Sequence, residues 1–179
     1  MSIHTVSDSN LASFPALTKL GVKNTFTYDN ATWGNMSLAS NPDSHRNYQR
    51  ILAELDIVNR TQVHMQVDHN DNCQLLTAAN LRIYKQFNLI PKTNIISIKA
   101  DSYITKEQVA ISASPADCMI IVMTAVDAKD GKRFLIFNHS GIFGAFLQSA
   151  LSAIRQAHMY YDFADPDLEV FIYPYISGK

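Results

Sequence analysis

The chain has 179 residues, of which 47% are apolar and 17% are charged, and its formal net charge is −1. This composition is typical of a globular domain whose core needs no disulfide framework, and the two cysteines are too few to build one. The sequence contains no run of eighteen apolar residues, so we expect no membrane span. It does not begin with a basic segment followed by an apolar one, so we expect a cytoplasmic protein without a signal peptide. Lys and Arg form no basic stripe, which argues against a nucleic-acid partner.

We expect residues 1–21 to form a lead-in segment and residues 22–179 to form one domain. Residues 22–28 are rich in Thr and Phe and predict a strand. A helix is predicted to begin near Asn41, a good N-cap, with Pro42 at its first position, and to reach Leu55. Alternating apolar residues predict a half-buried strand over residues 61–67, and the polar residues 68–72 predict a loop.

The second half is richer in strands. A weak helical pattern covers residues 75–87 and ends before Pro91. Four strands are predicted, at residues 95–98, 109–112, 119–126 and 134–137. Asp130-Gly131 predicts a hairpin turn between the last two of them. From Ile142 to about His158 the apolar residues follow a helical period, and residues 168–173 predict a final strand.

Three residues at the edges of these strands carry candidate chemistry. The predicted hairpin brings Cys118, at the start of one strand, toward His139, at the end of the next. A thiol beside an imidazole fits either a metal site or a nucleophile with its base. His69, in the polar loop, supplies a third metal ligand, and zinc in enzymes is often held by three protein ligands with water in a fourth position. Ordinary roles remain open for each: a buried thiol, a histidine that caps backbone groups, and a solvated loop histidine.

Five motifs occur in an order that resembles the laccase-domain family: Asn35-Met36-Ser37-Leu38, Gln66-Val67-Asp68-His69, Ala100-Asp101-Ser102-Tyr103-Ile104-Thr105, Ala116-Asp117-Cys118 and His139-Ser140-Gly141-Ile142-Phe143-Gly144. That family is known as multicopper polyphenol oxidase. Its better-supported activity is purine nucleoside phosphorylase, with adenosine deaminase and methylthioadenosine phosphorylase side activities. The resemblance covers roughly residues 22–179. It implies an α+β fold in a single domain, with mixed β-sheets packed together and flanked by helices.

The resemblance also implies a set of site residues. The family binds one zinc ion, with copper less favoured, and its ligands carry over to His69, Cys118 and His139, which would also be catalytic. His64 stays an alternative to His69, because Gln62-Val63-His64 matches the family motif without a gap. Four further residues are expected to bind or orient the substrate: Asn35, Asp117, Gly141 and Phe143.

The chain departs from the family pattern where Ile142-Phe143 replaces an aromatic–Arg pair. Phe143 lacks the charge with which an arginine binds phosphate. Family members also continue beyond the point that matches Lys179, so we expect the family's C-terminal part to be missing here.

Three functions therefore stay open. The first is a zinc-dependent purine nucleoside phosphorylase or adenosine deaminase-like enzyme, whose partners would be a purine nucleoside and phosphate. The second is a degenerate metal-binding domain without catalysis. The third is a hydrolase that uses Cys118 as nucleophile and His139 as base. Assembly into a homo-oligomer also stays open.

Overall fold

The structure is a computed structural model that describes residues 4–6, 11–27, 42–114, 118–141 and 143–173. The chain forms two compact units, residues 1–60 and 61–179. The boundary predicted at residue 21 falls inside the first unit, and the single domain over residues 22–179 stays a prediction.

In its described residues, the first unit contains a small antiparallel sheet and two helices. Strands β1 (His4–Val6), β2 (Leu11–Ser13) and β3 (Phe26–Thr27) pair in that order, and helix α1 (Pro15–Lys19) follows β2. The predicted lead-in therefore carries two strands and a helix, and the strand predicted at residues 22–28 is limited to β3. Helix α3 (Pro42–Glu54) confirms the predicted helix, and its buried residues recur one turn apart: Tyr48, Ile51 and Leu52.

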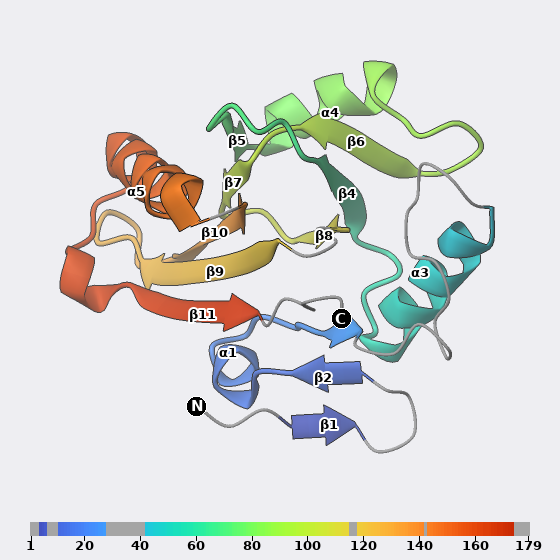
Figure 1. The fold of residues 1–179 in the computed structure, drawn as a ribbon, viewed down its shortest axis with the longest axis horizontal. Helices are drawn as coiled ribbons and strands as arrows, with labels where there is room; N and C mark the ends of the chain where they lie inside the picture. Colours follow the sequence, from blue (N-terminus) through green and yellow to red (C-terminus); the bar gives the residue numbers. More distant parts are fainter. Residues whose placement is uncertain (1–3, 7–10, 28–41, 115–117, 142, 174–179) are drawn as a thin grey trace. The chain divides into compact units, whose positions relative to one another are not determined.

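The second unit contains two sheets (Figure 1). Strands β4 (Thr61–Gln66), β6 (Ile95–Lys99) and β8 (Val109–Ala113) form a parallel sheet in the order β6-β4-β8. Strands β5 (Cys73–Leu76), β7 (Ser102–Thr105), β9 (Met119–Val126), β10 (Arg133–Ser140) and β11 (Glu169–Tyr173) form a mixed sheet in the order β11-β9-β10-β7-β5. Together with the helices that flank them, these sheets confirm the α+β fold class.

The two sheets of the second unit share one hydrophobic core. Val63 and Met65 of β4 pack in the same buried cluster as Tyr103 of β7. The Tyr103 hydroxyl donates a hydrogen bond of 2.7 Å to the carbonyl oxygen of Ile98 in β6. Because a buried phenol needs a hydrogen-bond partner, this contact fixes β7 against the opposite sheet.

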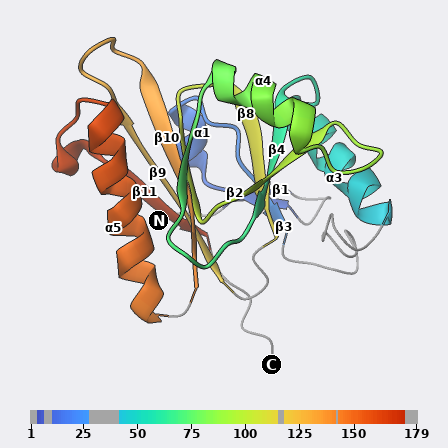
Figure 2. The same ribbon diagram turned by 90° about the horizontal axis from the view of Figure 1, so that it is seen from above.

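Two helices cover this sandwich. Helix α5 (Phe143–Tyr160) lies along the other face of the five-stranded sheet (Figure 2), where Ala153 and Ala157 are buried against Met123 and Ile136. Helix α4 (Ala78–Phe87) contacts β5 and β6, which are edge strands of the two sheets. Its Leu81 side chain is buried in the shared core, so α4 closes one side of the sandwich.

Three strands, β5, β7 and β10, differ from the sequence-based expectation. The helix predicted from residue 75 is wrong at its start, because residues 73–76 form β5 and α4 begins only after Thr77, whose hydroxyl caps it by accepting from the Asn80 N–H at 3.2 Å. Strand β7 was not predicted at all. Both strands are short and are held by pairing rather than by a local pattern, β5 with β7, and β7 with both β5 and β10. Strand β10 is also longer than predicted, which places His139 inside it.

No helix in the described residues combines the length and the apolar character needed to cross a membrane.

An ion-pair cluster closes the end of the β9–β10 hairpin. Lys106 Nζ contacts Asp127 Oδ2, lies 2.9 Å from Asp130 Oδ1, and sits 4.6 Å from the centre of the Tyr161 ring. The hydrogen bond from Lys106 lowers the pKa of Asp127 from 3.8 to about 2. Since the folded-state pKa is the lower one, the stabilisation is present above about pH 4 and is lost as the pH falls toward 2.

We therefore predict that Lys106→Met reduces the free energy of unfolding at pH 7 and flattens its fall between pH 4 and pH 2. Urea unfolding at a series of pH values measures this change. Lys132→Met, at an exposed lysine of the same hairpin, serves as the control and should keep the acid dependence of the parent protein. Equal acid profiles for the two variants would contradict the assignment.

Candidate metal centre

The carboxylate of Asp101 organises the candidate site. Asp101 lies between β6 and β7 and is only 3% exposed. Its Oδ1 accepts hydrogen bonds from the backbone N–H groups of Asp68, at 3.2 Å, and His69, at 2.8 Å. Its Oδ2 accepts from the N–H groups of Asn70, at 2.9 Å, and Asn72, at 3.3 Å. A buried carboxylate is thereby satisfied by four donors from one loop.

The loop that supplies these donors has an unusual backbone. His69 and Asp71 have positive φ angles, 58° and 55°, which non-glycine residues seldom adopt. Left-handed residues within a turn direct successive N–H groups into one concavity, a nest that binds anions. Here the anion is the Asp101 side chain. The position of His69 in the site therefore depends on a residue about thirty positions later in the chain.

A second histidine faces the first across this carboxylate. The backbone N–H of His139, in β10, donates to the Asp101 carbonyl oxygen at 2.8 Å, and His139 Nδ1 lies 3.9 Å from Asp101 Oδ1. The centres of the His69 and His139 rings are 5.6 Å apart, and the rings meet edge to face. One potential ligand atom from each of His69, Asp101 and His139 lies within 4.8 Å of the others, so this group could hold a metal ion.

The two histidines differ in their surroundings. His139 is 3% exposed, and burial lowers the pKa of its imidazole, against the opposing effect of the Asp101 charge. Its ring is therefore mostly neutral at neutral pH, which is the form that binds metal. His69 is exposed. The centre thus has one imidazole held in the core and one that faces solvent.

Asp101 is less suited than the two histidines to bind a metal ion directly. An ionised carboxylate offers about four acceptor positions. Four loop N–H groups already use the two oxygens of Asp101. Its carboxylate therefore serves mainly to position the loop that carries His69, which leaves the imidazole nitrogens as the groups suited to bind metal.

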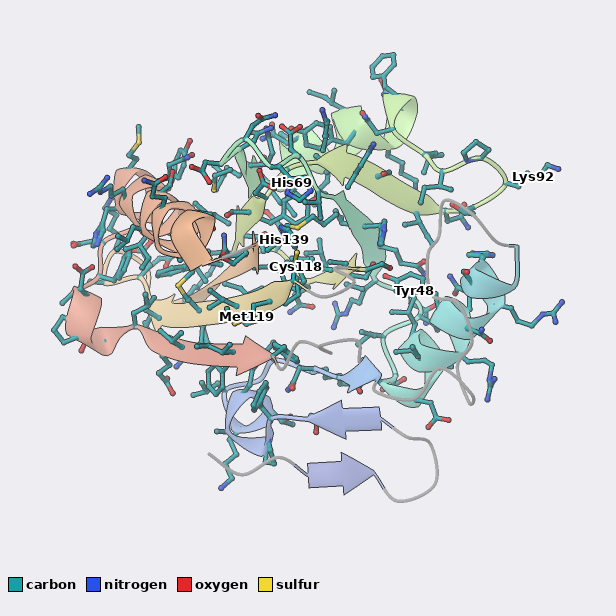
Figure 3. The ribbon with its side chains drawn as sticks, viewed as in Figure 1. Tyr48, His69, Lys92, Cys118, Met119 and His139 are labelled. Atoms are coloured by element: carbon teal, nitrogen blue, oxygen red, sulfur yellow. The ribbon has the colours of Figure 1, made fainter. Side chains whose placement is uncertain are left out.

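Cys118 approaches the same face of the sheet from the neighbouring strand. In the β9–β10 pairing Ser140 lies opposite Met119, so Cys118 continues opposite Gly141. A Cβ atom built on Gly141 would lie 4.0 Å from Cys118 Sγ. Side chains alternate along a strand, so the Cys118 side chain lies on the same face as that of His139, diagonally across the pair. Figure 3 labels Cys118, His139 and His69, but Cys118 Sγ is not part of the group formed by His69, Asp101 and His139.

The other predicted site residues, His64, Asn35, Asp117 and Phe143, are not placed in the group around Asp101. His64 lies within β4, bonds to Ser112 Oγ through Nδ1 at 3.0 Å, and is not part of the group around Asp101. Burial lowers the pKa of His64 to about 4. Asn35, Asp117 and the side chain of Phe143 lie outside the described residues.

Sequence reasoning missed the positioning role of Asp101. A signal was present, because Asp101 is a lone acid between buried Ala100 and buried Tyr103. Lone carboxylates in apolar segments need dedicated partners. The partners themselves are backbone groups, which carry no signature in the sequence.

Comparison with known proteins supports a family assignment. The sequence model of a family described as "Multi-copper polyphenol oxidoreductase laccase" matches residues 16–179. A comparison with curated proteins gives no match.

We predict that Asp101→Asn destabilises the protein by about 2–4 kcal/mol, because an amide presents one acceptor oxygen and leaves two buried N–H donors facing its NH₂ group. Denaturant unfolding measures the loss, and amide hydrogen exchange should show faster exchange at His69 and Asn70. Asp71→Asn, at an exposed residue of the same loop, should change the stability by less than about 0.5 kcal/mol. Unchanged protection of the loop amides in Asp101→Asn would contradict the role assigned to this carboxylate.

Proposed function

The chain belongs to the multi-copper polyphenol oxidoreductase laccase family, and from this premise we propose that it binds one zinc ion and acts on purine nucleosides. The observation that carries the proposal is the approach of His69 and His139, whose ring centres are 5.6 Å apart, beside the strand end that bears Cys118. The substrate class comes from the resemblance of the sequence motifs to those of the family.

The donor atoms favour zinc over copper. Two imidazoles and one thiol match the nitrogen and sulfur ligands of zinc sites, and three protein ligands leave a position open for water or substrate. We assign His69, Cys118 and His139 as the ligands. The Cys118 side chain would complete the set by turning about its Cα–Cβ bond along the face it shares with His139. This donor set suits one ion, whereas multicopper oxidation requires several copper sites.

A bound zinc ion supplies Lewis acidity and lowers the pKa of a coordinated water. The residues of the chain have separate tasks. The Asp101 carboxylate accepts from the His69 N–H at 2.8 Å, and the Asp101 carbonyl oxygen accepts from the His139 N–H at 2.8 Å. Buried His139 keeps a neutral ring available at neutral pH, and exposed His69 marks the side from which a substrate enters.

The proposed reaction uses water rather than phosphate as the acceptor. The sequence has Ile142-Phe143, where the family pattern has an aromatic–Arg pair. Binding an inorganic phosphate beside the nucleoside calls for a cationic, multidentate partner such as arginine, and an apolar side chain provides none. Hydrolytic chemistry of the deaminase type is compatible with this replacement, and phosphorolysis is not favoured by it.

The zinc proposal is tested by metal analysis of the purified chain. We expect about one zinc per chain, a loss of zinc affinity of at least about tenfold in His69→Ala and in Cys118→Ser, and full zinc content in His64→Ala. Loss of zinc in His64→Ala alone would show that the ligand loop is assigned wrongly. A metal-free protein whose Cys118 thiol reacts rapidly at neutral pH would instead support the hydrolase with Cys118 as nucleophile and His139 as base.

The substrate proposal is tested by incubating the zinc-loaded protein with adenosine and inosine, with and without phosphate, and separating the products by chromatography. We expect conversion of adenosine at a rate that does not depend on phosphate and that falls at least about 100-fold in Cys118→Ser. Strict dependence on phosphate would contradict the hydrolytic assignment. Zinc binding without conversion of either nucleoside would identify a non-catalytic member of the family.

A further inference from the structure

Helix α4 and the loop after it present an exposed surface that the metal centre does not use. This surface, here called the α4 surface, consists of Arg82, Ile83, Lys85, Phe87, Leu89 and Lys92. Phe87 is 79% exposed, Ile83 55% and Leu89 41%. Large apolar side chains exposed together on one element are a signal of an interaction site, unlike single exposed apolar residues.

The exposed apolar residues Ile83 and Phe87 lie on a helix that is anchored to the core. Ile83 and Phe87 are four positions apart and therefore neighbours on the helix. The same helix is anchored at two other positions, because Leu81 is buried in the core and the Tyr84 hydroxyl donates to Gln74 Oε1 at 3.1 Å. Exposure of Phe87 and Ile83 is thus not a consequence of a loosely packed helix.

The charge of this region has one sign. Residues 72–100 contain four basic residues, Arg82, Lys85, Lys92 and Lys99, and no Asp or Glu. Lys99 pairs with Asp68 at 2.6 Å, which leaves Arg82, Lys85 and Lys92 as the exposed cations of the α4 surface. Glu107 accepts from the Ala78 N–H at the other end of the helix, away from Phe87.

We propose that the α4 surface binds anionic lipid membranes peripherally. Exposed apolar side chains on a helix whose other exposed positions and following loop carry Lys and Arg are typical of an interfacial helix, which inserts its apolar groups at the headgroup level while its cations attract anionic lipids. Lys92 projects from the tip of the loop between α4 and β6 (Figure 3), which suits contact with a surface rather than insertion into a pocket. The proposal is independent of the proposed zinc chemistry.

The same charges argue against two other occupants. A second copy of this surface in a symmetric dimer would bring three cations against three cations, which is unfavourable. An acidic protein would match the charge, but it would also need a groove shaped for Phe87 and Ile83. A lipid interface accepts these side chains without a matching shape.

The test is cosedimentation of the full chain with phosphatidylcholine vesicles that contain or lack phosphatidylserine. We expect binding to the anionic vesicles only, weakened when the salt is raised from about 0.1 M to about 1 M. Phe87→Ser should lower the partition coefficient at least about fivefold, and Arg82→Gln combined with Lys85→Gln at least about tenfold. Two matched controls should bind like the parent: Met159→Ser, at a residue 74% exposed on α5, and Lys129→Gln combined with Lys132→Gln.

Thermal unfolding verifies that each variant is folded. If Phe87→Ser does not fold, Phe87→Trp serves instead, and a blue shift of its emission on adding anionic vesicles, relative to the parent protein, reports insertion. Lack of binding to phosphatidylserine vesicles, or equal losses in Phe87→Ser and Met159→Ser, would overturn the proposal. If the chain binds soluble polyglutamate but does not cosediment with vesicles, the proposal is also overturned, and an acidic protein partner is indicated.

Discussion

Four backbone N–H groups converge on the buried carboxylate of Asp101, and the candidate metal centre depends on this interaction. A buried carboxylate without partners is strongly unfavourable, and so is a loop with two left-handed non-glycine residues. The two unfavourable features stabilise each other, because the loop N–H groups donate hydrogen bonds to the Asp101 carboxylate and these bonds stabilise the left-handed backbone of the loop. His69 is placed by this exchange, and His139 is placed by the strand pairing of β10 with β7 beside the same carboxylate.

The three proposed ligands stand on different parts of the chain, and they differ in how firmly the structure holds them. His139 is carried by a buried strand, and Cys118 precedes the strand that pairs with it. Gly141 leaves the face opposite Cys118 without a side chain, so the thiol is not blocked there. His69 lies on a loop and is exposed, so the site combines a rigid wall with one solvent-facing ligand.

Helix α4 connects the site to the protein surface through a continuous set of hydrogen bonds. Tyr84 donates to Gln74 at 3.1 Å, and Gln74 Nε2 donates to Asn72 Oδ1 at 3.0 Å. The N–H of Asn72 is one of the four donors to Asp101. The buried side of α4 thus supports the loop of the metal centre, while its outer side carries the cations and apolar residues of the α4 surface.

Local patterns in the sequence determined most of the elements, since α3, α5 and the strands with strong alternation or continuous apolar runs follow from periodicity alone. They also pointed to Cys118 and His139 as candidate ligands, because a hairpin joins neighbouring segments, and to His69 as a candidate in a polar loop; the assignment of Cys118 stays a prediction. Only the tertiary structure decided that β5 and β7 are strands, since each depends on its partner. It alone decided that His69 rather than His64 faces His139, because the bonds from the loop to Asp101 join backbone groups to a distant side chain, and backbone groups are the same in every sequence.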